Sequence, residues 1–281
     1  MRWKLLVVFG GIVVAVGLLC WVLLSAVIGD TTASSGMRKQ QVGQALEAGN
    51  SRVGFEALQA REWLAYRAST TAVAEVFSRG TEAARRDAAT AEANHIRDAA
   101  MSEASFSLRA PAVVIFIDAQ GLVLGRNGSA LGRGDALAEV HPVIKDVLAD
   151  GRARSDVWLD SARQEQLLVS CAAVNAADGQ RLGALVMGAL LNDEWLDRLS
   201  DATSGLALAV ASAPSGAALQ VVARSAHAPE LLQSPGTGDT AQRAADAAVL
   251  QKHTAAAENE SAKTLVGAAP LVGAVGQPPV L

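Results

Sequence analysis

Four glycines that follow a short apolar run have a spacing that raises the question of phosphate binding. They are Gly125, Gly128, Gly132 and Gly134. A phosphate-binding loop places its glycines directly between a strand and a helix N-terminus, where backbone N–H groups meet the anion. A Walker loop also ends in Gly-Lys-Ser/Thr, whereas the first lysine after these glycines is Lys145. We therefore interpret the glycines as turn residues and not as a nucleotide site.

The sequence carries no recognised catalytic or metal-binding motif. The sequence contains neither a G-x-S-x-G nor an H-E-x-x-H motif. Its histidines are scattered, at His95, His141, His227 and His253, and His141, which precedes Pro142, is interpreted as a helix-capping or loop residue. His95 and Asp98 are one helical turn apart, but a single such pair is weak support for a metal site. We expect no enzymatic activity, no catalytic residues, no metal and no cofactor.

A long uncharged segment near the N-terminus predicts a membrane anchor. It spans residues 5–28, from Leu5 to Ile28, and as a helix it would be about 36 Å long, enough to cross a hydrocarbon layer of ~30 Å. Arg2 and Lys4 precede it and Asp30 is the first charge after it, so the positive-inside rule places residues 1–4 in the cytoplasm. A cleaved signal peptide is the alternative, but its apolar core would be shorter. We predict a retained transmembrane helix in the cytoplasmic (inner) membrane.

The rest of the chain is then periplasmic or extracellular. The charged fraction of 19% and the net charge of −4 of the whole sequence do not favour nucleic acid as a partner. Of the two cysteines, Cys20 lies in the predicted anchor and Cys171 far along the chain, so they are not expected to pair. The extracytoplasmic part must be held together by its hydrophobic core.

The order of elements predicts an α+β fold. Residues 37–106 lack proline and repeat apolar residues at helical spacing, which predicts one long helix or two consecutive helices. After Pro111 we expect strands at 113–117 and 122–126, a helix at 136–150, strands at 155–159, 165–174 and 181–191, and a short helix at 192–201. Runs of strands with segregated helices favour an antiparallel sheet.

A similar order begins again near residue 205. We expect a hairpin from 205–213 and 217–226, a helical and loop stretch at 227–263, and a last strand from 263, after which the chain ends on a turn. The predicted divisions are a cytoplasmic N-terminus (1–4), a transmembrane helix (5–28), a helical stalk (30–109), a first subdomain (110–201) and a second, incomplete subdomain (202–281).

Two motifs in these strands resemble the Cache family of extracytoplasmic sensor domains, which have a PAS-like fold. One is a D-x-x-G-x-V hairpin and the other a G-x-L-x-x-G closing strand, formed here by Asp118, Gly121 and Val123, and by Gly183, Leu185 and Gly188. The resemblance covers about residues 37–281 and implies a double-Cache sensor. It also implies that a small ligand lies between one sheet face and the loops and helix that cover it.

Five residues are candidates to contact such a ligand. Arg126 could pair with an anionic group, Trp158 could stack on an apolar part, and Gln166 or Ser170 could supply hydrogen bonds. Asp160 lies close to Trp158, but the Tyr, Arg, Trp and Asp motif of amino-acid-binding members is not intact. The alternatives are core packing for Trp158 and a solvated loop charge for Arg126.

The resemblance implies the ligand-sensing part of a bacterial membrane receptor that signals through its transmembrane helix. Its partners would be the bilayer, an unidentified small molecule, and a second copy that pairs through the long helices. A different reading keeps the membrane anchor but makes the extracytoplasmic part a protein-interaction or structural module without a small ligand.

Overall fold

The computed structural model describes the greater part of the chain after residue 37. The described residues are 38–103, 111–130, 132–160, 165–202, 207–212, 220–226, 228, 237–251, 255–259 and 264–271. The predicted anchor, residues 5–28, lies outside them. Among the helices in these ranges, none has both the length and the apolar character needed to cross a membrane.

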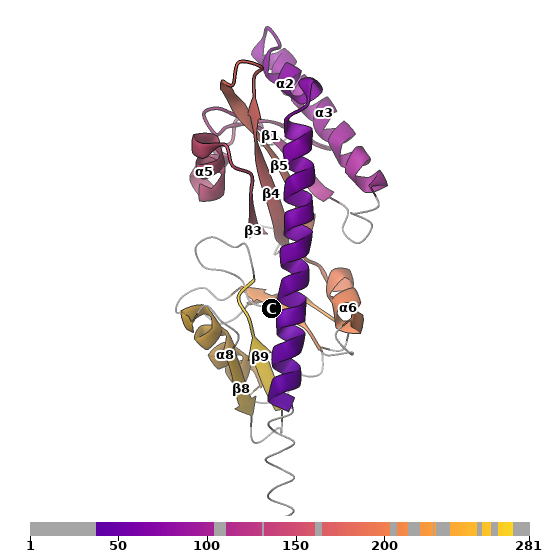
Figure 1. The fold of residues 1–281 in the computed structure, drawn as a ribbon, viewed down its shortest axis with the longest axis vertical. Coiled ribbons are helices and arrows are strands. Elements are labelled where there is room, and N and C mark those ends of the chain that lie inside the picture. The colour runs from indigo at the N-terminus through magenta and orange to yellow at the C-terminus, as the bar shows by residue number, and fades with distance from the viewer. Residues whose placement is uncertain are drawn as a thin grey trace, which may run out of the picture.

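Three helices, instead of the one or two that were predicted, precede the sheet. The first covers residues 38–68 and runs beside both halves of the molecule (Figure 1); it is called the long helix below. It is followed by α2 (Thr71–Phe77) and α3 (Glu82–Ser102). The Thr81 hydroxyl accepts a hydrogen bond from the Ala84 N–H, which caps the start of α3.

A five-stranded antiparallel sheet follows, as the sequence predicted. Its strands are β1 (Pro111–Asp118), β2 (Val123–Arg126), β3 (Arg154–Asp160), β4 (Glu165–Asn175) and β5 (Arg181–Leu190). Their order across the sheet is β2-β1-β5-β4-β3. The two strands at the edges, β2 and β3, are therefore as far apart as this sheet allows.

The prediction of a single helix over residues 136–150 is wrong, because the helix is interrupted at His141. The observed helices are α4 (Leu137–Val140) and α5 (Pro142–Asp150), and His141 between them is extended, with φ −119° and ψ 95°. A residue before proline is disfavoured from helical geometry by contact with the proline ring. Because of this break, the His141 side chain lies beside the sheet.

The two faces of the sheet are covered by different helices. On one face Phe116 and Leu185 pack with Leu64 of the long helix and Ile96 of α3. On the other face Ile117 and Val186 pack with Ile144 of α5. These are called the long-helix face and the α5 face. Each strand has side chains on both faces because neighbouring side chains along a strand point to opposite sides of the sheet.

The second half of the molecule contains α6 (Asp193–Ala202) and a hairpin of β6 (Ala209–Ser212) and β7 (Gln220–Arg224). It continues with α8 (Thr237–Gln251) and a hairpin of β8 (Ala255–Asn259) and β9 (Thr264–Ala268). Strand β8 lies in the stretch expected to be helix or loop. Its sequence, AAAEN, has little β-propensity, so only the pairing with β9 identifies it as a strand.

The long helix contributes to two hydrophobic cores. Leu46 and Val53 pack in the second half with residues such as Leu196 of α6 and Val210 of β6. Leu64, three turns further on, packs under the first sheet. One rigid element is thus held by both halves.

The opposite side of the long helix carries exposed apolar residues. Phe55, Leu58 and Tyr66 are 51%, 44% and 68% exposed. At 100° per residue they fall within a sector of about 80°, on the side opposite Val53 and Leu64. They are called the apolar stripe below. Glu62 lies within the same sector and contacts Arg61 at 3.2 Å.

The hairpin motif of the sequence is explained by its turn. Asp118 Oδ1 accepts hydrogen bonds from the N–H groups of Gln120 and Leu122, at 3.0 and 2.8 Å. Gly121 has φ +86°, and a methyl group on its Cα would overlap the Cβ of Ala138 in α4. Glycine is therefore required both for the turn and for the close approach of α4.

Cys171 is buried in the sheet, and burial raises the pKa of its thiol to about 12. We expect a Cys20→Ser variant, which leaves Cys171 as the chain's one thiol, to be inert to Ellman's reagent at pH 8. Full reaction should appear in denaturant. Labelling of the folded chain at the rate of an exposed thiol would contradict the burial.

Candidate functional site

The α5 face carries three polar or aromatic side chains in direct contact. The rings of His141 and Trp158 are stacked, with centroids 3.7 Å apart and an angle of 14° between their planes. The Trp158 indole N–H donates a hydrogen bond to Asp156 Oδ2 at 3.1 Å. Trp158 and Asp156 are both buried. These residues are called the aromatic cluster below.

The local sequence accounts for this geometry. Asp156 and Trp158 are two residues apart on β3, so strand alternation puts them on one face. Pro142 forces His141 out of the helix and over that face. Desolvation of the half-buried imidazole lowers the pKa of His141 below its usual 6.5, which favours the neutral ring that stacks on the indole.

We expect the stability of the chain to depend on pH through His141. The pKa of His141 is lower in the folded state than in the unfolded chain. The contribution of its neutral ring to the free energy of unfolding is therefore complete above about pH 6.5, and it is lost as the pH falls through the folded-state pKa. A His141→Phe variant keeps a stacked ring but does not titrate. Its melting temperature should fall less than that of the parent between pH 7 and pH 5. Equal losses would show that His141 does not contribute.

Two of the five residues predicted to contact a ligand lie on the other face. Gln166 and Ser170 alternate with Leu167 and Val169, which pack on the α5 face. Both Gln166 and Ser170 are buried toward the long helix side. They are therefore separated from Trp158 by the sheet itself.

The three remaining residues lie on the two edge strands. Arg126 is the last residue of β2 and is half-buried, while Trp158 and Asp160 belong to β3. Four strand spacings separate β2 from β3, or about 19 Å at ~4.8 Å each. The structure does not bring the five predicted residues together in one site.

The sequence reasoning missed His141 and Asp156. His141 was interpreted as a helix-capping or loop residue, and no role was given to Asp156. A usable signal was present, because an acidic residue and a tryptophan at i and i+2 on a strand share a face, and a residue before proline leaves the helix.

The glycine-containing loop after β2 is tied to α3. The Arg133 guanidinium donates hydrogen bonds to Asp87 Oδ1 and Thr90 Oγ1, at 3.1 and 2.8 Å. The Gly128 N–H donates to Asn94 Oδ1 at 3.0 Å. The interpretation as turn residues is confirmed for three glycines with positive φ, namely Gly128, Gly132 and Gly134, whereas Gly125 lies within β2.

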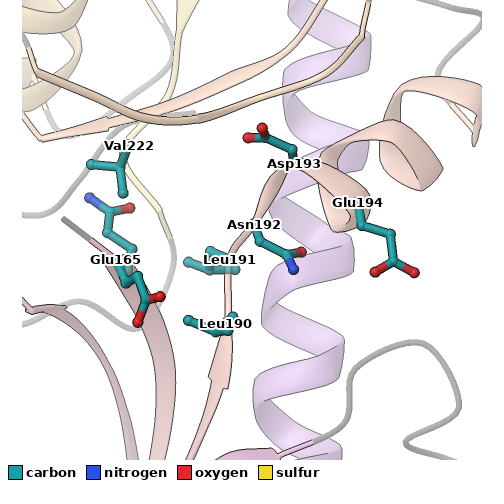
Figure 2. Close-up of a pocket in the computed structure, with 8 residues that line it drawn as sticks. Glu165, Leu190, Leu191, Asn192, Asp193, Glu194 and Val222 are labelled. Atoms are coloured by element: carbon teal, nitrogen blue, oxygen red, sulfur yellow. The ribbon is translucent and has the colours of Figure 1, made fainter. Parts of the chain in front are cut away.

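A separate pocket of about 340 Å³ lies between the two halves (Figure 2). It is lined by Glu165, Gln166, Leu190, Leu191, Asn192, Asp193, Glu194 and Val222. These residues come from β4, from the end of β5, from the connection between β5 and α6, from the start of α6 and from β7. Gln166, one of the predicted ligand contacts, thus lines this pocket and not the α5 face.

Solved sensor domains share this fold over most of the chain. The periplasmic domain of LuxQ from Vibrio cholerae is 15% identical and matches 85% of this chain and 97% of its own, with a TM-score of 0.50. A domain of a proposed sensory box/GGDEF family protein from Vibrio parahaemolyticus is 11% identical and matches 86% and 94%, with a TM-score of 0.52. The extracellular domain of vpHK1S-Z8, a proposed histidine kinase, is 11% identical and matches 86% and 88%, with a TM-score of 0.53.

No protein-family model and no curated protein sequence matches the chain. At identities of 11 to 15% the structural matches establish the fold. The resemblance to extracytoplasmic PAS-like sensor domains that the sequence suggested is confirmed at this level.

Proposed function

We propose that this chain is the extracytoplasmic, ligand-sensing part of a membrane-anchored signal-transduction receptor of the Cache type, without catalytic activity. The fold shared with sensor domains supports a sensing role. The observation that carries the proposal is the position of the long helix, because it joins both hydrophobic cores to the N-terminal side of the chain.

The long helix is suited to transmit a change in packing. The described helix begins at residue 38, ten residues after the end of the predicted membrane span at residue 28. A ligand that alters how the sheet packs would change the position or rotation of the helix between discrete arrangements, because packed cores do not deform continuously. The movement would then reach the membrane anchor.

We assign the ligand to the α5 face, at the aromatic cluster. A flat or apolar group of the ligand would stack on Trp158 in the place that His141 occupies, and Asp156 would orient the indole. Displacement of His141 would move the junction between α4 and α5. Arg126 is too far along the sheet to contact the same small molecule.

The receptor would act as a homodimer through its long helices. The apolar stripe supports this assignment, since apolar side chains at helical spacing on the side away from the core are suited to a second helix. The alternative function is an anchored module that uses the extracytoplasmic part to bind a protein, with no small ligand.

Thermal denaturation of the full chain with single compounds tests the proposal. The set would cover carboxylic acids, amines, sugars and purines. A ligand at a hundredfold its Kd adds about 2.7 kcal/mol, which corresponds to a rise in Tm of about 5 to 10 °C. The Trp158→Leu variant should lose the rise caused by a compound bound at the aromatic cluster, whereas a Trp63→Leu variant in the long helix, which covers the other face of the sheet, should keep it. The absence of any rise across the set would favour the interaction module.

A further inference from the structure

The pocket between the halves contains a buried polar group that has no hydrogen-bond partner among the described residues. Gln166 is 1% exposed and lines the pocket. Its side-chain Oε1 has no hydrogen-bond partner in the described structure. A buried acceptor without a donor lowers the stability of the folded chain, so a ligand that supplies a donor would recover that free energy.

The side chains around Gln166 are acidic or apolar. Three carboxylates line the pocket, those of Glu165, Asp193 and Glu194, and the described residues of its lining include no lysine, arginine or histidine. Figure 2 shows Glu165 and Val222 on one side of the pocket, and residues of the connection between β5 and α6 on the other. The site therefore attracts positive charge.

Part of this polar lining already has a structural role. The Asn192 side chain accepts a hydrogen bond from the Trp195 N–H at 3.1 Å and caps α6. Asp193 accepts one from the Arg224 N–H at 2.8 Å, and Glu194 pairs with Arg198 at 2.7 Å. Acidic residues in the first turn of a helix also interact favourably with its dipole.

The side chains of Glu165 and Gln166 have no structural role of this kind. The Glu165 side chain makes no hydrogen bond or ion pair within the described part of the chain, and the residue is half-buried beside Gln166. The backbone here is satisfied, since the Gln166 carbonyl oxygen accepts the Leu191 N–H at 2.8 Å. Alternation along β4 turns the two side chains to opposite sides of the strand, but both residues line the pocket at the end of β4, and no described residue supplies either with a donor.

We propose that this pocket binds a small aliphatic amine in its ammonium form. The ammonium group would donate a charge-assisted hydrogen bond to Gln166 Oε1, and the negative charge of Glu165 at the end of the strand would attract it. The apolar side chains of Leu190, Leu191 and Val222 would contact the alkyl part. This site is distinct from the aromatic cluster, and the inference does not depend on the proposed sensing function.

Because β7 contributes Val222, a bound amine would contact both halves of the molecule. It would join the ends of β4 and β5 to the β6–β7 hairpin. The amine would therefore stabilise one arrangement of the halves relative to the others.

Isothermal titration of the full chain with 1,4-diaminobutane tests the inference, with 1,4-butanediol as the neutral probe of similar shape. We expect heat of binding for the diamine and none for the diol. The affinity should fall as the salt concentration rises, because the attraction is partly ionic. Calcium chloride serves as a third probe, for a divalent cation site.

Two variants test the assigned contacts. Glu165→Gln removes a charge that has no structural partner, and Gln166→Leu removes the unpaired amide at similar volume. Each should weaken diamine binding at least about tenfold. The matched control is Glu103→Gln, an exposed carboxylate after α3, which should leave the affinity unchanged.

Equal binding of diamine and diol would overturn the inference. So would unchanged diamine affinity in Glu165→Gln, or binding of calcium without binding of the diamine. Gln166→Leu should not unfold the chain, since replacing an unsatisfied amide by an apolar side chain of similar size is neutral or stabilising. Loss of diamine binding with an unchanged melting temperature would therefore support the assignment.

Discussion

The Gly183→Ala variant is expected to lose at least about 3 kcal/mol of the free energy of unfolding, although it adds only one methyl group. Gly183 lies on β5, the central strand, between Asp118 of β1 and Val174 of β4. A Cβ at this position would overlap the Ile117 carbonyl oxygen and would lie 2.6 Å from the Phe77 ring. Neither neighbouring strand can move away without breaking its own ladder of hydrogen bonds.

Urea denaturation, followed by circular dichroism, measures this effect. The matched control is Gly43→Ala in the long helix, where a Cβ would meet no atom within 4 Å. Alanine there should stabilise the chain by about 0.5 to 1 kcal/mol, because glycine is a poor helix former. The packing account would be wrong if Gly183→Ala unfolded at the same urea concentration as the parent.

The second large effect is expected on the oligomeric state. A Phe55→Glu, Leu58→Glu double variant should be monomeric at concentrations where the parent is a dimer, which halves the measured mass. Both side chains are exposed on the side of the long helix opposite its buried residues, so the change should leave the core intact. Glutamate favours helices, and like charges brought together at a dimer interface repel.

Size-exclusion chromatography with light scattering makes the measurement. Met101→Glu is the control, since Met101 is also an exposed apolar residue, 53% exposed, but lies on α3 outside the apolar stripe. It should remain dimeric. A parent chain that is monomeric over the same range, or a double variant that still forms dimers, would contradict pairing through the apolar stripe.

The sheet was predicted well because the sequence pattern that identifies a strand is local. Alternating or continuous apolar runs bounded by turn residues placed all five strands within two residues of their observed ends, and predicted their antiparallel arrangement. The helix break at His141 was missed although Pro142 signals it. The short loops at Ser69 and Thr70 and at Gly80, which separate the long helix, α2 and α3, carry weaker signals.

The candidate site was predicted less well because it depends on which strands become neighbours. Strand alternation alone separates Gln166 and Ser170 from Trp158, so this error was avoidable. The distance from Arg126 to Trp158 was not predictable in the same way, because it follows from the positions of β2 and β3 at opposite edges. The pocket around Gln166 requires the second half to pack against the first, which no local pattern reveals.

Hydrogen–deuterium exchange tests the central claim, that a ligand on the α5 face acts on the long helix. The full chain would be compared with and without a compound that raises its melting temperature. We predict slower exchange in residues 137–150 and 154–160, together with altered exchange in residues 38–68. Protection that leaves the long helix unchanged, or that does not include the α5 face, would contradict the account.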